Sequence, residues 1–342
     1  MSSSKPKLAI TFGDIAGIGP EIIVSGWSRI IERDDCIPIA YGNKAVFEKA
    51  IQLLGLDCKV QTITSPAMAE PSKNVIPCIN CSSGDLLNVR PGMISAVAGE
   101  AAYHAIVTAT IHATLGEVDA VVTTPINKKA FNLAGCHFPG HTELIASRCG
   151  VDNFAMMLYL GPDSCICGPA GLAVVHVTLH TAMRNIFDII TTDNVLAKIR
   201  LAENFMQKMK NEPPQIGVCS LNPHAGENGL FGQEELNIIQ PAVRLAQVEG
   251  LNVTGPFPAD TIMIDARDGK FDAVVAMFHD QGHIALKLLG MHHAVNITLG
   301  LPIIRTSVAH GTAFEIAWQG KAKPDSLIEA CRVATILAQN KF

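Results

Sequence analysis

Short runs of aliphatic residues alternate along this chain with longer segments in which apolar residues recur every three or four positions. Short continuous apolar runs are typical of strands buried in a parallel sheet, whereas the longer period is that of a helix packed on one face. The pattern predicts strands at residues 8–12, 38–41, 119–123, 155–160, 172–177, 215–219, 272–277 and 295–298. It predicts helices at residues 94–115, 194–209, 234–247 and 326–338. This alternation indicates an α/β fold with a largely parallel sheet.

Glycine and proline separate these predicted elements. Gly13, Gly17 and Gly19 stand between the first strand and Pro20, which predicts a tight turn and then a helix with proline in its first turn. Their spacing is not G-x-G-x-x-G, so a standard Rossmann dinucleotide site is not supported, and close packing of strand onto helix explains these glycines equally well. The segment 65–91 is rich in Ser, Pro and Asn and is predicted to be a loop.

Composition narrows the classes of function. The chain has 342 residues, of which 48% are hydrophobic and only 5% aromatic, so a core sufficient for two domains is filled mainly by aliphatic side chains. The formal net charge is −5 and no Lys/Arg cluster follows one face, which argues against a nucleic-acid partner. The longest apolar stretches are far too short to cross a membrane, and the N-terminus lacks a secretory signal, so we expect a cytoplasmic protein. The ten cysteines show no paired zinc-site spacing, which predicts reduced thiols.

Histidines are distributed unevenly, because the chain has 12 and none precedes His104. His180, His224 and His279 each follow a predicted strand, and ligands of α/β proteins gather at the carboxyl ends of strands. Three imidazoles at one sheet edge would suit a divalent transition metal with open positions for substrate. Their spacing carries no local metal signature, so an ordinary polar loop residue is the alternative for each. Asp260 could add a carboxylate ligand, orient a histidine or cap a helix.

Other polar residues at predicted turns could bind an anion. Lys287, Asn296 and Arg305 are cationic or amide donors of the kind that holds a phosphate or carboxylate. His141 and Thr142 lie in a turn that is predicted to open a helix, where their alternative role is only to cap it. A common binding site requires these residues to converge.

The segment around Gly311 and Thr312 is a candidate cofactor loop. It precedes a helix-like stretch at residues 313–317. Free N–H groups at the start of a helix could face an anion such as a pyrophosphate, whereas an ordinary helix start is the alternative.

Six motifs, in order along the chain, carry a resemblance to a known family. They are Gly13-Asp-Ile-Ala-Gly-Ile-Gly-Pro-Glu21, Thr123-Thr-Pro-Ile-Asn-Lys128, Phe138-Pro-Gly-His-Thr-Glu143, Asn222-Pro-His-Ala-Gly-Glu227, Phe278-His-Asp-Gln-Gly-His283 and Leu299-Gly-Leu-Pro-Ile-Ile-Arg-Thr-Ser307. Together they resemble the PdxA family, typified by 4-hydroxythreonine-4-phosphate dehydrogenase, over nearly the whole chain.

The resemblance implies a subunit like those of isocitrate and isopropylmalate dehydrogenases. Its two α/β domains, with a cleft between them, would span approximately residues 1–130 plus 305–342 and residues 131–304. It also implies a homodimer with the active site at the subunit interface, and an NAD site without the Rossmann fingerprint. A divalent metal is expected (Zn, Co, Mn, Ni or Mg), with imidazole ligands favouring Zn, Co or Ni over Mg.

The resemblance also implies roles for individual residues. The metal ligands would be His180 and His224 of one subunit and His279 of the partner subunit. The substrate contacts would be His141, Thr142, Lys287, Asn296 and Arg305. Lys128 and Asp260 are both candidates for the catalytic proton acceptor, and the cofactor loop would contain Gly311 and Thr312.

Within the family, the segments 222–232, 279–290 and 316–323 are most similar to the branch that oxidises 4-phospho-D-threonate and D-erythronate 4-phosphate. That branch implies NAD-dependent oxidative decarboxylation to dihydroxyacetone phosphate and CO2. The alternatives are 4-hydroxy-L-threonine 4-phosphate oxidation in pyridoxal 5'-phosphate (vitamin B6) biosynthesis, aromatic cis-dihydrodiol oxidation, and a metal-dependent phosphatase or aldolase without NAD. Ala309 stands where the family has Asp beside the cofactor loop, which leaves NAD and NADP both open.

Overall fold

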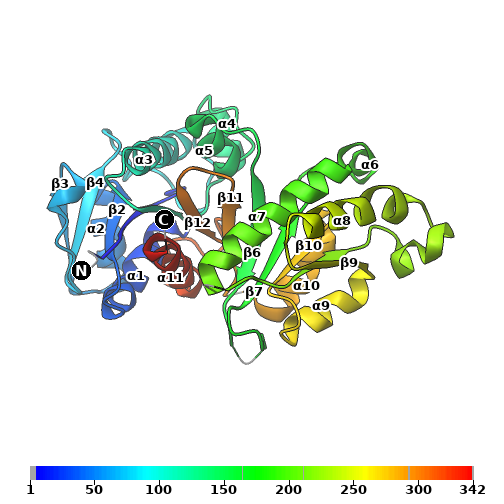
Figure 1. The fold of residues 1–342 in the computed structure, drawn as a ribbon. Coiled ribbons are helices and arrows are strands. Elements are labelled where there is room, and N and C mark those ends of the chain that lie inside the picture. Colours follow the sequence, from blue (N-terminus) through cyan, green and yellow to red (C-terminus); the bar gives the residue numbers. More distant parts are fainter. Residues whose placement is uncertain (1–4, 164, 211, 292, 341–342) are drawn as a thin grey trace. The chain divides into compact units, whose positions relative to one another are not determined.

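The computed structural model describes residues 5–163, 165–210, 212–291 and 293–340, and the chain divides into two compact units (Figure 1). Unit 1 comprises Met1–Asp152 and Leu301–Phe342, and unit 2 comprises Asn153–Gly300. These bounds differ from the expected ones at residues 130 and 305. The reason is packing, because helix α5 (His141–Cys149) lies against α3 (Ala96–Thr114) and so belongs to unit 1.

Unit 1 contains a six-stranded sheet in which every recorded strand pair is parallel. In spatial order its strands are β3 (Lys59–Ile63), β4 (Val75–Asn80), β2 (Ile37–Gly42), β1 (Lys7–Thr11), β5 (Ala120–Thr123) and β12 (Ile304–Val308). Strand β1 lies in the interior of the sheet, where Leu8 aligns with Pro38 on one side and with Ala120 on the other. The pairing of β12 with β5 joins the two chain segments of this unit.

Helices cover both faces of the unit 1 sheet (Figure 1). One face carries α3, α4 (Lys128–Leu133) and α5, and the other carries α1 (Gly19–Glu32), α2 (Lys44–Leu54) and α11 (Asp325–Gln339); a 3₁₀ turn, η1 (Pro66–Met68), joins β3 to β4. On the α3 face, Ala102 and Ala109 pack against Ala9, Ile39 and Val121 of the strands. The small alanines of α3 therefore let this helix lie close to the sheet.

Unit 2 is built on a mixed sheet of six strands. In spatial order these are β11 (Val295–Leu299), β6 (Ala155–Leu160), β7 (Leu172–His176), β10 (Ala273–Ala276), β8 (Ile216–Cys219) and β9 (Val253–Phe257). The pairs β11–β6 and β6–β7 are antiparallel, and the pairs from β7 to β9 are parallel. The expectation of a largely parallel sheet is confirmed except at β6, which runs antiparallel to both of its neighbours, β11 and β7.

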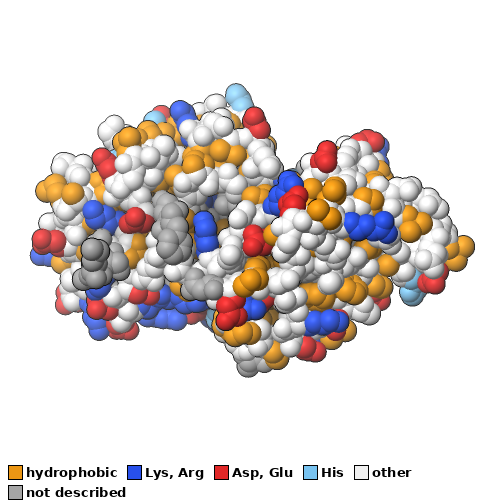
Figure 2. Space-filling model, in the orientation of Figure 1, with side chains coloured by type: hydrophobic (Ala, Val, Ile, Leu, Met, Phe, Trp, Pro, Cys, Tyr) orange, Lys and Arg blue, Asp and Glu red, His pale blue; other side chains and the backbone are white. Residues whose placement is uncertain are grey.

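Helices also cover both faces of the unit 2 sheet. They are α6 (Ile186–Ile189), α7 (Thr192–Lys210), α8 (Gln240–Val248), α9 (Ala259–Arg267) and α10 (His279–Gly290), with short turns η2 (Met183–Asn185), η3 (Pro223–Gly229) and η4 (Glu235–Ile239). Tyr159 of β6 packs on Phe205 of α7, and Val174 of β7 lies against Gly282 of α10. On the face shown in Figure 2, acidic, basic and apolar side chains all occur over each unit. No helix of the described part of the chain is long and apolar enough to span a membrane.

The structure agrees with the predicted strands but adds four others, β3, β4, β9 and β12. Strand β4 lies inside the segment 65–91, which is predicted to be a loop. The prediction misses it because Pro77 and the polar residues on either side obscure its apolar pattern. Strand β12 carries Arg305, Thr306 and Ser307, so its sequence lacks an apolar run although it is buried. The helix expected at residues 313–317 is absent, because Ala313 adopts a φ of 45° and the segment forms turns. All ten cysteines are free thiols.

Candidate active site

The parallel strands of unit 2 bring the three predicted metal ligands to one sheet edge. His180 follows β7, His224 follows β8, and His279 follows β10 as the first residue of α10. Strand β10 pairs in parallel with both β7 and β8, so the carboxyl ends of all three strands point the same way. The edge is therefore the place where α/β sheets collect ligands.

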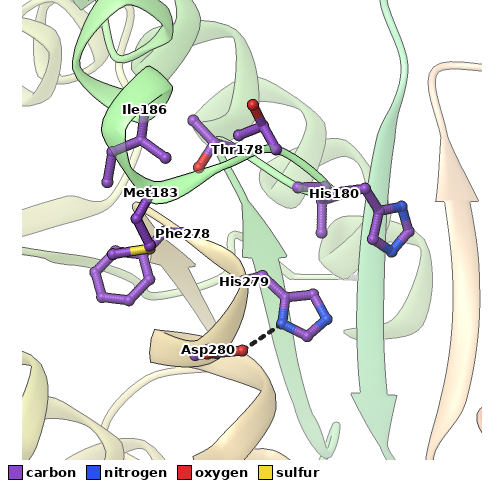
Figure 3. Close-up of a pocket in the computed structure, with 9 residues that line it drawn as sticks. Thr178, His180, Met183, Ile186, Phe278, His279 and Asp280 are labelled. Atoms are coloured by element: carbon purple, nitrogen blue, oxygen red, sulfur yellow. Dashed lines mark hydrogen bonds and ion pairs between the residues drawn. The ribbon is translucent and has the colours of Figure 1, made fainter.

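His180 and His279 line one pocket of about 270 Å³ at this edge, together with Thr178, Phe278 and Asp280 (Figure 3). The centres of the two imidazole rings are 5.9 Å apart. His279 Nδ1 lies 2.7 Å from Asp280 Oδ1, and a ring N–H donated to that carboxylate leaves Nε2 free to bind a metal.

Two further histidines, His283 and His176, lie beside His279, and neither is among the predicted metal ligands or substrate contacts. His283 stacks on His279 with ring centres 3.8 Å apart, and its Nδ1 lies 3.1 Å from Nε2 of His176. Burial lowers the pKa of His176 to about 3 and that of His283 to about 4, so both rings are neutral at physiological pH. The one sequence signal for His176 is its place near the end of the strand predicted at residues 172–177, and the structure ends this strand at His176.

His224 lines a second pocket, of about 310 Å³, with Asp260, Asn222 and Gln281. Phe278 lines both pockets. Among the described residues, no three His, Cys, Asp or Glu side chains come together closely enough to hold a metal ion. One chain therefore pairs His180 with His279 and His224 with Asp260, without gathering the three histidines. Asp260 does not cap α9, because the N-cap position is Pro258.

His224 opens a left-handed turn within η3. His224, Ala225, Glu227 and Asn228 have φ between 43° and 55°, and Gly226 has a φ of 75°. Residues with a side chain pay about 1–2 kcal/mol each in this conformation. The turn persists only because surrounding contacts hold it, and such strain is concentrated at functional sites.

Unit 1 gathers a second set of predicted residues. Arg305 of β12 is 2% exposed, and its Nη2 donates to Oγ1 of Thr123, on β5, at 2.7 Å. Burial lowers the pKa of Arg305 to about 10, while the nearby Glu143 carboxylate raises it, so the guanidinium is charged at neutral pH. Lys128 begins α4 just beyond β5 and lies beside Gly140 at the start of α5.

His141, the first residue of α5, lies close enough to Arg305 and Lys128 for their charges to lower its pKa. Burial holds its pKa well below the usual range, and the charges of Arg305 and Lys128 lower it further, whereas a hydrogen bond to the Thr124 backbone raises it. The ring is partly buried, and its Nε2 atom is inaccessible and has no hydrogen-bond partner in the described part of the chain. A neutral imidazole beside two cations suits an anionic ligand that offers it a hydrogen-bonding group. Thr142 follows it as the second residue of α5.

The candidate cofactor loop packs on the glycine turn of unit 1. The Ile18 N–H donates to the Thr312 carbonyl at 3.1 Å, and a Cβ on Gly17 would lie 2.8 Å from that same oxygen. Close packing therefore requires glycine at position 17, in agreement with the sequence prediction that these glycines serve close packing. Gly311 has open space where a Cβ would be, so its backbone is accessible to a ligand.

The same turn holds a buried carboxyl that the sequence analysis did not assign. Asp14 is 1% exposed and accepts a hydrogen bond from the Ala16 N–H at 2.8 Å. Burial raises its pKa to about 6, against the effect of that hydrogen bond. Its Oδ2 has no partner within the described residues.

The two remaining predicted substrate contacts belong to unit 2. Asn296 lies on β11, where its Nδ2 donates to Sδ of Met156 at 3.3 Å and its buried Oδ1 has no partner within the described residues. Lys287 lies in the last turn of α10. Each unit thus carries part of the predicted substrate set.

Comparison with known proteins shows the family. The family model described as "Pyridoxal phosphate biosynthetic protein PdxA" matches residues 34–334. The D-threonate 4-phosphate dehydrogenase of Pectobacterium atrosepticum is 42% identical, over 97% of this chain and 99% of the relative. The 4-hydroxythreonine-4-phosphate dehydrogenase of Trichlorobacter lovleyi is also 42% identical, over 100% of both chains. A crystal structure of 4-hydroxythreonine-4-phosphate dehydrogenase from Klebsiella pneumoniae superposes with a TM-score of 0.85 at 39% identity, covering 99% of this chain and 100% of that one. The chain therefore belongs to the PdxA family and is a dehydrogenase.

Proposed function

We propose that this enzyme oxidises and decarboxylates a 4-phosphorylated four-carbon hydroxy acid, 4-phospho-D-threonate or D-erythronate 4-phosphate, to dihydroxyacetone phosphate and CO2. Relatives named D-threonate 4-phosphate dehydrogenase support this substrate class. Relatives of equal similarity named 4-hydroxythreonine-4-phosphate dehydrogenase support 4-hydroxy-L-threonine 4-phosphate as the second candidate. Both substrates carry a terminal phosphate and a carboxylate.

The observation that carries the proposal is the cationic cluster in unit 1. The buried guanidinium of Arg305, the ammonium of Lys128 and the neutral ring of His141 all lie near the starts of α4 and α5. A buried, planar guanidinium is the side chain best suited to phosphate. In the proposal Arg305 binds this group with Lys287 and Asn296, and His141 and Thr142 hold the rest of the acid.

The donor set at the edge of unit 2 fits a divalent metal. Imidazole ligands suit Zn, Co or Ni, and a carboxylate such as that of Asp280 beside His279 is the usual partner of a metal-binding histidine. The proposed ligands are His180 and His224 of one subunit and His279 of the partner subunit. Sharing of the site between subunits is consistent with the described part of one chain, in which no three His, Cys, Asp or Glu side chains come together. When bound, the metal would act as a Lewis acid that polarises the substrate's C3 hydroxyl and stabilises negative charge on that oxygen.

The proposed cofactor is NAD, with its phosphates at Gly311 and Thr312. The open space around Gly311 supports this placement, because backbone can approach a ligand closely there. NAD supplies the hydride acceptor. Because position 309 is Ala, no carboxylate stands there beside the proposed cofactor loop. NADP is therefore the alternative cofactor, and the assay must compare it with NAD.

The proposed reaction requires a hydride acceptor, a proton acceptor and the cleavage of one carbon–carbon bond. When bound, NAD would take the C3 hydrogen with its electron pair as hydride. The hydroxyl proton would pass to the Asp260 carboxylate or to Lys128, which can accept it only after its ammonium group has lost a proton. The C1–C2 bond of the resulting 3-keto acid then breaks to release CO2, and its electrons form an enolate that takes a proton at C2. Binding of the phosphate holds the C3 hydrogen in position for transfer.

The decisive experiment is an absorbance assay at 340 nm with the three phosphorylated acids, NAD or NADP, and several divalent metals. We expect NADH and dihydroxyacetone phosphate from 4-phospho-D-threonate or D-erythronate 4-phosphate. Faster turnover of 4-hydroxy-L-threonine 4-phosphate would select the second candidate. Phosphate release or carbon–carbon cleavage without NADH would identify the phosphatase or aldolase instead.

A variant of His224 tests whether metal binding can be lost while the fold is retained. His224→Ala should abolish metal uptake and turnover while its circular dichroism and unfolding temperature stay close to those of the wild type. His104→Ala, which removes an exposed histidine of α3, is the matched control. Full activity of metal-stripped His224→Ala would contradict the proposed metal site.

A further inference from the structure

A buried carboxylate, that of Glu235, accepts three hydrogen bonds from the segment that precedes the left-handed turn at His224. Glu235 is 1% exposed and lies in the first position of the π-helical turn η4. Its Oε1 accepts hydrogen bonds from the backbone N–H groups of Leu221 and Asn222, both at 2.8 Å. Its Oε2 accepts a third from Asn222 Nδ2 at 3.0 Å.

These three hydrogen bonds fix the segment that leads from β8 to His224. Leu221 and Asn222 are the two residues immediately before Pro223, at which η3 begins. The Ser220 hydroxyl donates to the Asn222 carbonyl at 2.9 Å and fastens the same segment from its other end. Asn222 Nδ2 also donates to Glu234 Oε2 at 2.7 Å. Of these partners, only Glu235 binds the backbone N–H groups that lead into the turn, and it therefore sets the direction in which the chain enters it.

Glu235 also limits the turn itself. A Cβ on Gly226 would lie 2.5 Å from Glu235 Oε2, so the middle of the turn rests against this carboxylate. Backbone bonds then close the turn, as Phe231 donates to the Gly226 carbonyl at 3.1 Å and Leu230 donates to that of Glu227 at 3.2 Å. A strained backbone that is enclosed in this way has one accessible arrangement rather than several.

We propose that Glu235 is a positioning residue, which holds the left-handed turn so that His224 lies in the pocket it shares with Asp260. The inference rests on the proposed function, in which His224 is a metal ligand. A π-helical turn costs regular hydrogen bonding and is found mostly at functional sites, and here it carries Glu235 to the turn. Glu235 acts through the backbone of Leu221 and Asn222 and does not itself touch the metal or the substrate.

The test is a titration of the metal-free, full-length protein with cobalt(II), whose visible absorption reports the number and geometry of its ligands. We expect Glu235→Ala to weaken cobalt binding by about 10- to 100-fold and to change the spectrum, as the loss of a residue that orients a ligand does. Glu235→Gln keeps an oxygen for the two backbone N–H groups but loses one of the two acceptors of Asn222 Nδ2, the other being Glu234 Oε2 at 2.7 Å. Its cobalt affinity should therefore lie between those of the wild type and Glu235→Ala. Val243→Ala, a cavity variant in the following helix α8, is the control for destabilisation alone.

Each outcome decides the proposal. A lower unfolding temperature in Val243→Ala with the wild-type cobalt spectrum, together with weakened binding in Glu235→Ala, supports it. Wild-type affinity and spectrum in folded Glu235→Ala overturn it, as does an equal loss of cobalt binding in Val243→Ala. If Glu235→Ala does not fold, Glu235→Gln decides, and wild-type affinity, spectrum and protection of the Leu221 and Asn222 amides from hydrogen exchange overturn it.

A failure of the proposed function is recognised separately. Wild-type cobalt binding by His224→Ala would show that His224 is not a metal ligand. The effect of Glu235→Ala on amide exchange in the turn would then still report whether Glu235 holds this backbone.

Discussion

At the scale of single residues, the candidate site depends on side chains kept in unusual states by burial. His141, His176 and His283 are all neutral because desolvation disfavours the charged imidazole. Arg305 is charged although it is 2% exposed, since no ordinary environment deprotonates a guanidinium at neutral pH. A neutral donor and acceptor beside a fixed cation is a combination suited to holding an oxyacid.

The lowered pKa of His141 predicts a pH dependence of stability. Between the usual pKa of 6.5 and the lower folded value, the unfolded chain binds a proton that the folded chain does not. The contribution of His141 to the free energy of unfolding is therefore fully present above pH 6.5. It decreases as the pH falls, by about 1.4 kcal/mol per pH unit for one proton. His141→Asn should flatten the pH dependence of urea unfolding between pH 6.5 and pH 5 by this amount. His104→Asn is the exposed control, and an unchanged slope in His141→Asn would refute the prediction.

Asp14 should act in the opposite direction. Its pKa is raised from 3.8 to about 6, so between these values the folded protein binds a proton that the unfolded chain does not. Its contribution favours folding below pH 3.8 and is lost as the pH rises towards 6. Asp14→Asn should therefore be relatively more stable than the wild type at pH 7 than at pH 4, as measured by urea unfolding. A stability difference that is the same at both pH values would contradict this sign.

At the scale of elements, glycines set how closely α10 lies on its sheet. A Cβ on Gly282 would lie 2.5 Å from Nε2 of His176 and 2.6 Å from Cγ1 of Val174. Helix α10 begins with His279, so its distance from β7 also places that histidine relative to His180. The packing of one helix on one strand thus sets the geometry of the first pocket.

Gly282→Ala should lower the free energy of unfolding by about 1–3 kcal/mol, because the added methyl group forces α10 away from β7. Gly290→Ala, in the same helix, is the matched control. There the nearest atom is the end of the flexible Leu160 side chain at 2.9 Å, so its effect should be smaller. Chemical denaturation of both variants measures the difference, and equal values would contradict the expected role of Gly282.

A buried glutamate holds the candidate cofactor loop of unit 1 much as Glu235 holds the turn of unit 2. Glu21 of α1 is 1% exposed and accepts hydrogen bonds from the backbone N–H groups of Trp318 and Gly320. Trp318 has a φ of 58°, and its indole N–H donates to the Ile15 carbonyl at 2.8 Å. The carboxylate therefore fastens the end of the loop that follows Gly311 and Thr312.

Glu21→Ala should cost about 1–3 kcal/mol of stability for each N–H group left without a partner, and should weaken binding of the nicotinamide cofactor. Urea unfolding and fluorescence titration with NADH measure the two effects. Glu32→Ala, which removes an exposed carboxylate of the same helix, is the control. Unchanged cofactor affinity in Glu21→Ala would separate this loop from cofactor binding.

At the scale of the whole molecule, the two units differ in how the chain builds them. Unit 2 is one continuous segment, and all six of its strands come from Asn153–Gly300. Unit 1 needs both chain ends, because β12 pairs with β5 and the Thr306 hydroxyl donates to the Ala330 carbonyl of α11. The ends of the chain are therefore part of one core.

This difference predicts how fragments behave. A fragment of residues 153–300 should fold on its own with a cooperative thermal transition by circular dichroism. A fragment of residues 1–152 should not, because β5 loses β12, one of its two neighbouring strands, and α11 is missing from the face that it covers. Addition of the separate segment 301–342 should restore structure. Cooperative unfolding of residues 1–152 alone would contradict the expected dependence.

The sequence alone determined which residues stand at the carboxyl ends of strands, because buried strands have a local apolar signature and the polar motifs follow them directly. His180, His224, His279 and Lys128 could all be selected in this way, whereas Arg305 lies within β12. What lies between them could not, since the apolar signature is missing from β12 and the contacts of His176, Glu235 and Glu21 join residues far apart in the chain. Long-range packing and hydrogen bonding decide the antiparallel pairing of β6 and the left-handed turn at His224. They also decide that His180 and His279 share one pocket while His224 lines another. Local sequence therefore selects the reactive groups, and only tertiary structure decides which of them are buried, neutral and held in place.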